Sequence, residues 1–461
     1  MTARVLLLNP PSETVGAGNQ RLTRVLYPPP PGGLASVAAC LLRAGHEVVI
    51  RDLVLEPCPT EVLVQQALAL RPDAIGFSVL GPTLASTREL SSRLKTALPG
   101  VHVFAGNALP SEYPAWFLDE VPACDAVVVG EGEQTAVELV DSGFSRPVAG
   151  AVRRGDRPED FEIRPQISDL DSLPFPAWQL LPYRKYRASP QLLFRSAPTL
   201  GVLQSRGCPW SCGFCAQNYL WPQVRVRSLD SVAEELKRNL VDFGVRHHGF
   251  FDSIFPLKKG YGAGLHESLQ RAGLLGKLRL FCETRADMVW EEDFTWLRKA
   301  GLHLVFLGIE SPSEALLRTQ DKIRAMYDVR QAVATLARLK LRSYGLFVLG
   351  LPGEVAADRE ALLELALSLP LDVASFGLYT RYPGSPTARQ EGAAPQDLTS
   401  CNWGDVEELA AEQRRMMKAF YLRPALVARH LLRREIAMDR LLAGAFSLLA
   451  GPGLRPPASD P

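Results

Sequence analysis

The sequence lacks the features that would direct a protein to a membrane or to nucleic acid. No apolar run reaches the length of about 18 residues that suggests a membrane-spanning helix, and Val5–Leu8 is too short for a secretion signal. Neither sign of charge is in excess, because 51 Lys and Arg stand against 50 Asp and Glu. Bulk electrostatic binding of nucleic acid is therefore disfavoured. We expect a cytoplasmic protein whose partners include neither a membrane nor a nucleic acid.

Cysteine is also scarce, with eight residues in a chain of 461. Because cytoplasmic thiols stay reduced, these residues do not predict a disulfide framework. Three of them are crowded in the spacing C-x3-C-x2-C, at Cys208, Cys212 and Cys215. The other five are scattered singly, as expected of small buried residues: Cys40, Cys58, Cys124, Cys282 and Cys401.

The length and the ordinary apolar content predict a folded protein of several domains. We expect four regions, at residues 1–144, 145–190, 191–390 and 391–461. The second is rich in Pro and Arg and is interpreted as an ordered linker. The last has helical periodicity over Asp405–Leu432 and Ile436–Leu449 and is interpreted as a helical extension.

In residues 1–144, short apolar runs alternate with amphipathic stretches, which predicts a doubly wound, flavodoxin-like α/β sheet. Such sheets bind ligands beyond the carboxyl ends of their strands. No Gly-x-Gly-x-x-Gly follows the first strand, so a dinucleotide site is disfavoured. A purely structural domain remains an alternative from the pattern alone. Strands are expected at Arg4–Asn9, His46–Arg51, Ala74–Ser78, Val101–Ala105 and Ala126–Val129, and helices at Leu34–Ala44, Pro59–Ala69 and Leu84–Leu98.

The three clustered cysteines follow an expected strand and point to an iron–sulfur cluster. Three thiolates on a tight loop can hold three irons of a 4Fe–4S cluster, which leaves the fourth iron open. A structural zinc site would use four ligands, but neither Cys nor His occurs in the 30 residues after Cys215. Strand–helix units then repeat, as a partial (β/α)6 barrel requires. The later strands are expected at His248–Asp252, Leu278–Thr284, Leu304–Glu310, Ser343–Leu349 and Ala374–Tyr379.

The C-x3-C-x2-C loop, with Phe214 before its last cysteine, resembles that of the radical S-adenosylmethionine (SAM) superfamily. The N-terminal segment resembles a cobalamin-binding domain in Ser78-x-Leu80 and in the Gly-Glu-Gly-Glu sequence at 130–133. It departs from that domain at Gly106-Asn107, where a Gly-Gly pair is usual. Nearly the whole chain thus resembles the cobalamin-dependent radical SAM enzymes, the class B radical SAM methyltransferase family.

The resemblance implies three cofactors: a 4Fe–4S cluster, SAM and cobalamin. It assigns the cluster to Cys208, Cys212 and Cys215. It assigns SAM to Phe214, Asp252, Glu283, Arg285, Gly308, Glu310 and Gly350. It assigns cobalamin to Asn9, Pro10, Ser78, Leu80, Gly106, Asn107, Gly130, Glu131 and Gly132.

The implied activity is transfer of a methyl group from methylcobalamin to a carbon of a small natural-product substrate. A 5′-deoxyadenosyl radical made from SAM would first remove a hydrogen atom from that carbon. A flavodoxin- or ferredoxin-type protein would supply the electron. The alternative within the family is an oxidative cyclase or a ring-rearranging enzyme that transfers no methyl group. A non-enzymatic sensor is disfavoured, because the cluster motif and the polar strand ends are intact.

The sequence predicts that cobalamin binds with no protein histidine below the cobalt. The Asp-x-His-x-x-Gly loop of His-ligated cobalamin proteins is absent, and positions 11–19 contain no His. The nearest N-terminal histidines, His46 and His102, precede expected strands and so lie at the opposite end of the sheet. We expect the electron paramagnetic resonance spectrum of bound Co(II) to show no nitrogen superhyperfine splitting. A clear nitrogen pattern would contradict this prediction.

Overall fold

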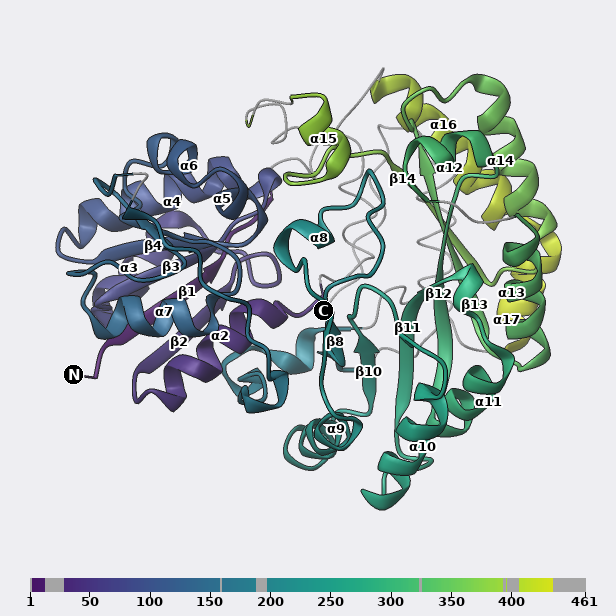
Figure 1. The fold of residues 1–461 in the computed structure, drawn as a ribbon, viewed down its shortest axis with the longest axis horizontal. Coiled ribbons are helices and arrows are strands. Elements are labelled where there is room, and N and C mark those ends of the chain that lie inside the picture. The colour runs from purple at the N-terminus through teal and green to yellow at the C-terminus, as the bar shows by residue number, and fades with distance from the viewer. Residues whose placement is uncertain are drawn as a thin grey trace.

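The computed structural model describes residues 2–12, 29–157, 160–187, 197–322, 326–392, 395 and 406–433. The helix expected at Ile436–Leu449 lies outside these residues. The described chain forms two parallel sheets with helices around each, and the cysteine loop lies between them (Figure 1). The α/β fold class expected from the sequence is confirmed.

The first sheet has the strand order β2-β1-β3-β4-β5-β6. Its first five strands are parallel, and β6 pairs antiparallel with β5 at the edge. The interior strand β1, between β2 and β3, is almost wholly apolar and buried, as a strand covered by helices on both faces must be. The strands are β1 (Arg4–Asn9), β2 (Glu47–Asp52), β3 (Ala74–Ser78), β4 (His102–Gly106), β5 (Ala126–Val128) and β6 (Ala151–Arg153).

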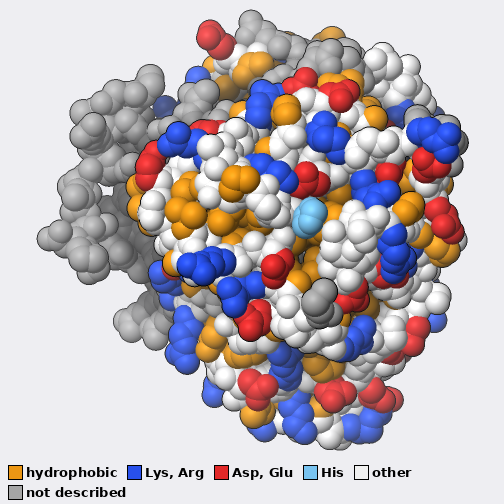
Figure 2. Space-filling model, turned by 90° about the vertical axis from the view of Figure 1, so that its left-hand side faces the viewer, with side chains coloured by type: hydrophobic (Ala, Val, Ile, Leu, Met, Phe, Trp, Pro, Cys, Tyr) orange, Lys and Arg blue, Asp and Glu red, His pale blue; other side chains and the backbone are white. Residues whose placement is uncertain are grey.

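Helices cover both faces of the first sheet, and apolar clusters fill the space on each side. They are α2 (Gly32–Arg43), α3 (Thr60–Leu70), α4 (Leu84–Ala97), α5 (Ala108–Glu112), α6 (Pro114–Glu120) and α7 (Gly132–Asp141). Strand β6 was not expected, because residues 145–190 were interpreted as a linker. On the face that this sheet and its helices present, basic and acidic side chains are interspersed (Figure 2).

The second sheet has the order β14-β13-β12-β11-β10-β7, and all its pairings are parallel. Its edge strands do not pair with each other, so the expected partial (β/α)6 barrel is confirmed. Burial alternates along β13, which gives the sheet one face against the helices and one inner face, here called the lumen. The strands are β7 (Thr199–Val202), β10 (His247–Phe250), β11 (Arg279–Arg285), β12 (Leu302–Glu310), β13 (Arg342–Leu349) and β14 (Val373–Leu378).

The helices of this half pack on the outer face of the second sheet. In α9, the Ser228 side chain caps the N-terminus and Gly244 ends the helix in a left-handed conformation. The helices of this half are α9 (Leu229–Phe243), α10 (Tyr261–Arg271), α11 (Glu291–Ala300), α12 (Glu314–Thr319), α13 (Met326–Arg338) and α14 (Ala356–Ser368). A two-stranded ribbon, β8 (Ser205–Arg206) with β9 (Arg225–Val226), carries the cysteine loop and α8 (Gln217–Leu220).

The region expected as a helical extension is part of the barrel's packing. Helices α16 (Val406–Tyr421) and α17 (Pro424–Arg433) follow the short α15 (Pro386–Gln390). Met416 and Phe420 of α16 are fully buried in the main apolar cluster of the barrel. The Tyr421 hydroxyl donates to the carbonyl of Ala374, so α16 covers the edge strand β14. No helix among the described residues is long and apolar enough to cross a membrane.

Candidate active site

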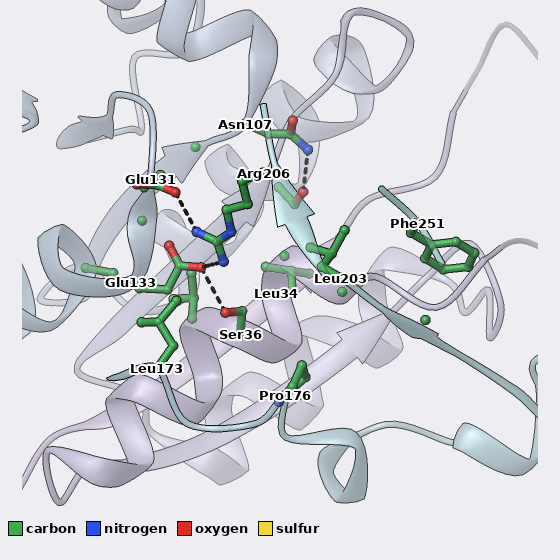
Figure 3. Close-up of a pocket in the computed structure, with 18 of the residues that line it drawn as sticks. Leu34, Ser36, Asn107, Glu131, Glu133, Leu173, Pro176, Leu203, Arg206 and Phe251 are labelled. Atoms are coloured by element: carbon green, nitrogen blue, oxygen red, sulfur yellow. Dashed lines mark hydrogen bonds and ion pairs between the residues drawn. The ribbon is translucent and has the colours of Figure 1, made fainter. Parts of the chain in front are cut away.

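A cavity of about 430 Å³ lies between the two halves of the chain. One wall comes from the carboxyl ends of β3, β4 and β5 and from the start of α2. The other comes from the ribbon, the residues after β10 and the beginning of α8, and includes Arg206, Gln217 and Phe251. Residues 170–178, in the segment that connects the halves, cross its side. Figure 3 shows Asn107, Glu131 and Arg206 grouped together, with Phe251 at a distance from them.

The first-sheet wall contains six of the nine residues that the resemblance assigned to cobalamin: Ser78, Gly106, Asn107, Gly130, Glu131 and Gly132. The Asn107 side chain donates to the Ser78 hydroxyl at 3.0 Å and accepts from the Ala108 amide. Asn107 has φ +90°, a left-handed conformation that favours glycine. This explains why a Gly-Gly pair is usual at this position.

The other three of these residues do not line the cavity. Asn9 donates to Asp52 at 2.8 Å, and Asp52 also accepts a hydrogen bond from the buried Tyr186 hydroxyl. Pro10 is buried beside Asn9. Leu80 is 47% exposed and begins the short turn that leads into α4. Asp52 therefore anchors the connecting segment to the first sheet through Tyr186, and Asn9 holds the Asp52 carboxylate in place.

A buried network of ion pairs joins the first sheet's glycine loop to the ribbon that carries the cysteines. Arg206 binds Glu131 at 2.6 Å and Glu133 at 2.5 Å, and Arg225 binds Glu131 at 2.8 Å. The Ser36 hydroxyl also donates to Glu133. Burial would raise the pKa of Glu131, but hydrogen bonds from Arg225 and Arg206 outweigh it and lower that pKa. Two positive and two negative side chains thus compensate one another.

Sequence reasoning missed Arg206 and Arg225. The carboxylate of Glu131, a residue that the resemblance assigned to cobalamin, is held by both arginines and by the Ile167 amide. One signal was present in the sequence. An arginine stands directly before Gly207 and the cysteines, and two glutamates lie in the glycine loop that was already assigned to the site.

The three cysteines lie on the loop between β8 and α8, and all are half-buried. The Gly213 amide donates to the Gln320 carbonyl, and the Gly213 carbonyl accepts from the Thr387 amide. The loop is thus held between the segment after α12 and helix α15. Phe214 packs against Leu316, Leu351 and Tyr379 in a small apolar cluster.

The donor set fits a cluster better than a single ion. Among the described residues, no three Cys, His, Asp or Glu side chains converge on one metal position. The ligands of a 4Fe–4S cluster bind separate irons and need not converge in that way. Burial raises the pKa of all three thiols, that of Cys215 to about 11. Iron binding must therefore displace protons from thiols that are neutral at pH 7.

Charged groups at the carboxyl ends of β11 and β12 face the cysteine loop. Lys322 pairs with Glu310 at 2.5 Å, and its ammonium group lies 5.8 Å from the centre of the Phe214 ring. Glu310 has φ +55°, a strained conformation that is frequent at functional sites. A Cβ on Gly308 would lie 2.7 Å from the Glu310 carboxylate, so Gly308 makes room for this pair.

Glu283 and Arg285, on β11, lie next to this pair. The Glu283 side chain is accessible from the lumen but surrounded by protein, and this desolvation together with Glu310 raises its pKa to about 7. Arg285 donates to both carboxylate oxygens of Asp287 and stacks over Trp210 of the cysteine loop at 4.7 Å. These residues place one titratable carboxyl and one fixed cation near the cysteines.

Two further residues assigned to SAM have structural partners. Asp252 accepts hydrogen bonds from the amides of Gln204 and Ser205 and from the Ser205 hydroxyl, so it shapes the start of the ribbon. Burial raises its pKa to about 6. Gly350 has φ +80°, and an added Cβ would lie 2.7 Å from Leu409 of α16. The described contacts of Gly350 are thus with Glu354 and α16.

Comparison with known proteins finds two domain models in the chain. Residues 21–140 match the B12 binding domain, and residues 202–366 match the radical SAM superfamily. The chain is 28% identical to an uncharacterized methyltransferase of Pyrococcus horikoshii, over 92% of this chain and 94% of that one. It is 26% identical to the anaerobic magnesium-protoporphyrin IX monomethyl ester cyclase of Cereibacter sphaeroides, over 77% of this chain and 59% of the cyclase.

The fold resembles that of the radical SAM methyltransferase TsrM from Kitasatospora setae, solved with cobalamin and a [4Fe–4S] cluster bound. The TM-score is 0.66 at 20% identity, over 85% of this chain and 78% of that one. A B12 binding domain followed by a radical SAM domain defines the cobalamin-dependent radical SAM enzymes, and this chain is one of them. Its cofactors are cobalamin, a 4Fe–4S cluster and SAM.

The residues present fit these groups. An added Cβ on Gly33 or Gly130 would meet no protein atom within 4 Å, so the backbone is bare where it lines the cavity. A large ligand such as cobalamin can therefore approach the first sheet closely. Cys208, Cys212 and Cys215 provide three thiolates, with Lys322 and Arg285 beside them to offset negative charge.

We expect the Cys208→Ala/Cys212→Ala/Cys215→Ala variant to hold no cluster after anaerobic reconstitution, because no other ligands in the described chain can replace the three thiolates. Iron and sulfide analysis measures this directly. Cys58→Ala, which removes a half-buried cysteine of the first half, is the matched control and should keep a full cluster. About four irons per chain in the triple variant would show that the cluster lies elsewhere.

We expect Arg206→Gln to destabilise the protein by about 3–5 kcal/mol, because it leaves Glu133 buried without its cation. Arg389→Gln is the control. It removes a pair with Glu112 that also joins the halves, but Arg389 is half exposed, and such pairs contribute about 1 kcal/mol or less. Urea denaturation compares the two variants. Equal effects would show that the buried network is not what holds the halves together.

Proposed function

We propose that the protein is a methyltransferase that moves a methyl group from cobalamin to a carbon of a small-molecule substrate. One observation carries this proposal. A single cavity is lined on one side by the carboxyl ends of the first sheet, and on the other by Gln217, two residues after the last cysteine. A substrate carbon at this junction would lie between the two cofactor-binding regions.

When bound, SAM at the cluster supplies the hydrogen-abstracting 5′-deoxyadenosyl group, and cobalamin supplies the methyl group. The protein contributes position. The network of Arg206 and Arg225 holds the glycine loop of the first sheet against the β8–β9 ribbon, in which Gly207 directly follows β8. Since reacting atoms must approach to about 3–3.5 Å, the fixed separation of these two elements is the main requirement on the chain.

The residues around the cysteine loop would orient SAM, whose methionine end carries an amino and a carboxylate group. We propose that Cys208, Cys212 and Cys215 hold the cluster, and that Glu310 and Glu283 lie at the amino and ribose side. Arg285 is positioned by Asp287 and Trp210 and is a cation beside the loop that could face the carboxylate. The wall of the cavity is mostly apolar, and this limits water at the site.

A second candidate is an oxidative cyclase or ring-rearranging enzyme with the same cofactors and no methyl transfer. The 26% identity with the magnesium-protoporphyrin ester cyclase supports this second candidate. The chain spans 59% of that cyclase. The P. horikoshii relative matches over nearly its whole length, and its name denotes a methyltransferase.

We expect each methylation to consume two SAM molecules by two routes. One SAM donates its methyl group to cobalamin and leaves S-adenosylhomocysteine, and the other leaves 5′-deoxyadenosine and methionine. Both nucleosides should form in near equal amounts with a product that is heavier by one CH2, as mass spectrometry can measure. Abundant 5′-deoxyadenosine without S-adenosylhomocysteine or methylated product would instead establish the cyclase alternative.

A further inference from the structure

We propose that the lumen of the barrel binds a substrate with a flat ring system that carries no negative charge, which packs against a row of aromatic side chains. The inference rests on the proposed function in one respect, that the substrate carbon lies at the barrel mouth. It goes further by naming the class of substrate.

The row consists of Phe251, Phe281, Phe306 and Tyr344, from four neighbouring strands or their ends. Phe251 follows β10, and the others lie on β11, β12 and β13. Successive ring centres are 6.1, 5.8 and 4.6 Å apart. Phe281, Phe306 and Tyr344 form an apolar cluster separate from the one between sheet and helices, which places the row on the lumen face.

Two glycines of the neighbouring strands make room for these rings. A Cβ on Gly249 would lie 2.3 Å from Phe281, and a Cβ on Gly201 would lie 2.3 Å from Phe251. Side chains on β7 and β10 at these positions would push the rings away from the sheet. The rings therefore lie over bare strand backbone, and their combined surface forms one side of the lumen.

The row is not sealed by the protein. Phe281 is buried, but Phe251 is 39% exposed, and Phe306 and Tyr344 are half-buried. Leu346 and Val348, which follow Tyr344 on the same face of β13, are also half-buried. An apolar wall of this kind gains free energy when a ligand removes it from water. Phe251 also lines the cavity between the halves, so the row is continuous with the proposed cobalamin side.

The charges near the row disfavour a negatively charged substrate. Lys322 is paired with Glu310, and Arg285 with Asp287, at the carboxyl ends of the strands. Glu283, opposite Phe306 in the register of β11 and β12, presents a further carboxyl group to the lumen. Tyr344 offers a hydroxyl group, which shares a hydrogen bond with Ser375. Aromatic pairs, stacked or edge-to-face, gain about 0.5–1.5 kcal/mol beyond the area they bury. These features together favour an aromatic ring system over a phosphate ester or a saturated polycycle.

The experiment measures binding without turnover, on the holoenzyme reconstituted anaerobically with its cluster, cobalamin and SAM. Two probes share one carbon skeleton: 2-naphthylmethanol is flat, and decahydro-2-naphthylmethanol is saturated. Isothermal titration calorimetry should show tighter binding of the flat probe. Phe306→Leu keeps an apolar side chain and should weaken binding of the flat probe by about 2- to 10-fold. The affinity for the saturated probe should change much less. Tyr344→Leu repeats the test on the neighbouring strand.

The matched control is Trp296→Leu, which removes an aromatic ring on the outer helix α11, where Trp296 packs beside His266. It should leave both affinities unchanged. Equal binding of the two probes by the wild-type protein, or an equal loss of both in the two lumen variants, would overturn the proposal. Formation of S-adenosylhomocysteine tests methyl transfer, whereas calorimetry tests the class of substrate. A negative result for one proposal would therefore leave the other standing.

Discussion

The buried ion pairs of Arg206 hold the two halves of this enzyme in register. Arg206 stands two residues before the first cysteine, and its guanidinium binds Glu131 and Glu133 of the first sheet's glycine loop. Because the group is buried, either half alone would leave charges without partners, at a cost of several kcal/mol. The pair of Glu112 with Arg389, whose side chain is half exposed, joins the same halves and should impose a weaker constraint. The cavity and the approach of its two walls depend on this network.

Around the network, the polar and the apolar side chains of the site lie in separate places. The carboxyl ends of β11 and β12 place Glu283, Arg285 and the Glu310–Lys322 pair beside the cysteine loop, where we propose that the charged end of SAM binds. Farther into the lumen, the side chains become aromatic, and Gly249 and Gly201 leave room for the rings of Phe281 and Phe251. In the proposed reaction, the charged groups would hold the cosubstrate while apolar walls keep water from the reacting carbon.

Much of the fold could be predicted, since each central strand is a short apolar run with turn residues at its end. β1 and β3 were located at their observed bounds, and the cysteine spacing alone indicated the cluster. Side-chain partners could not be predicted in the same way. Asn9 binds Asp52, and Gly350 meets Leu409, 59 positions along the chain. Strand β6 was missed because its three residues lie in a Pro- and Arg-rich stretch. The role of Arg206 depends on a contact across 73 positions that no local pattern encodes.

If the Arg206 network holds the cobalamin face and the cluster loop at one fixed separation across the cavity, that separation can be measured. Pulsed electron paramagnetic resonance can measure the distance between Co(II) and the reduced cluster in the frozen, fully loaded enzyme. We expect a single narrow distance distribution for the wild-type protein and a broadened one for Arg206→Gln. A broad distribution in the wild-type enzyme, or one that Arg206→Gln leaves unchanged, would contradict this expectation.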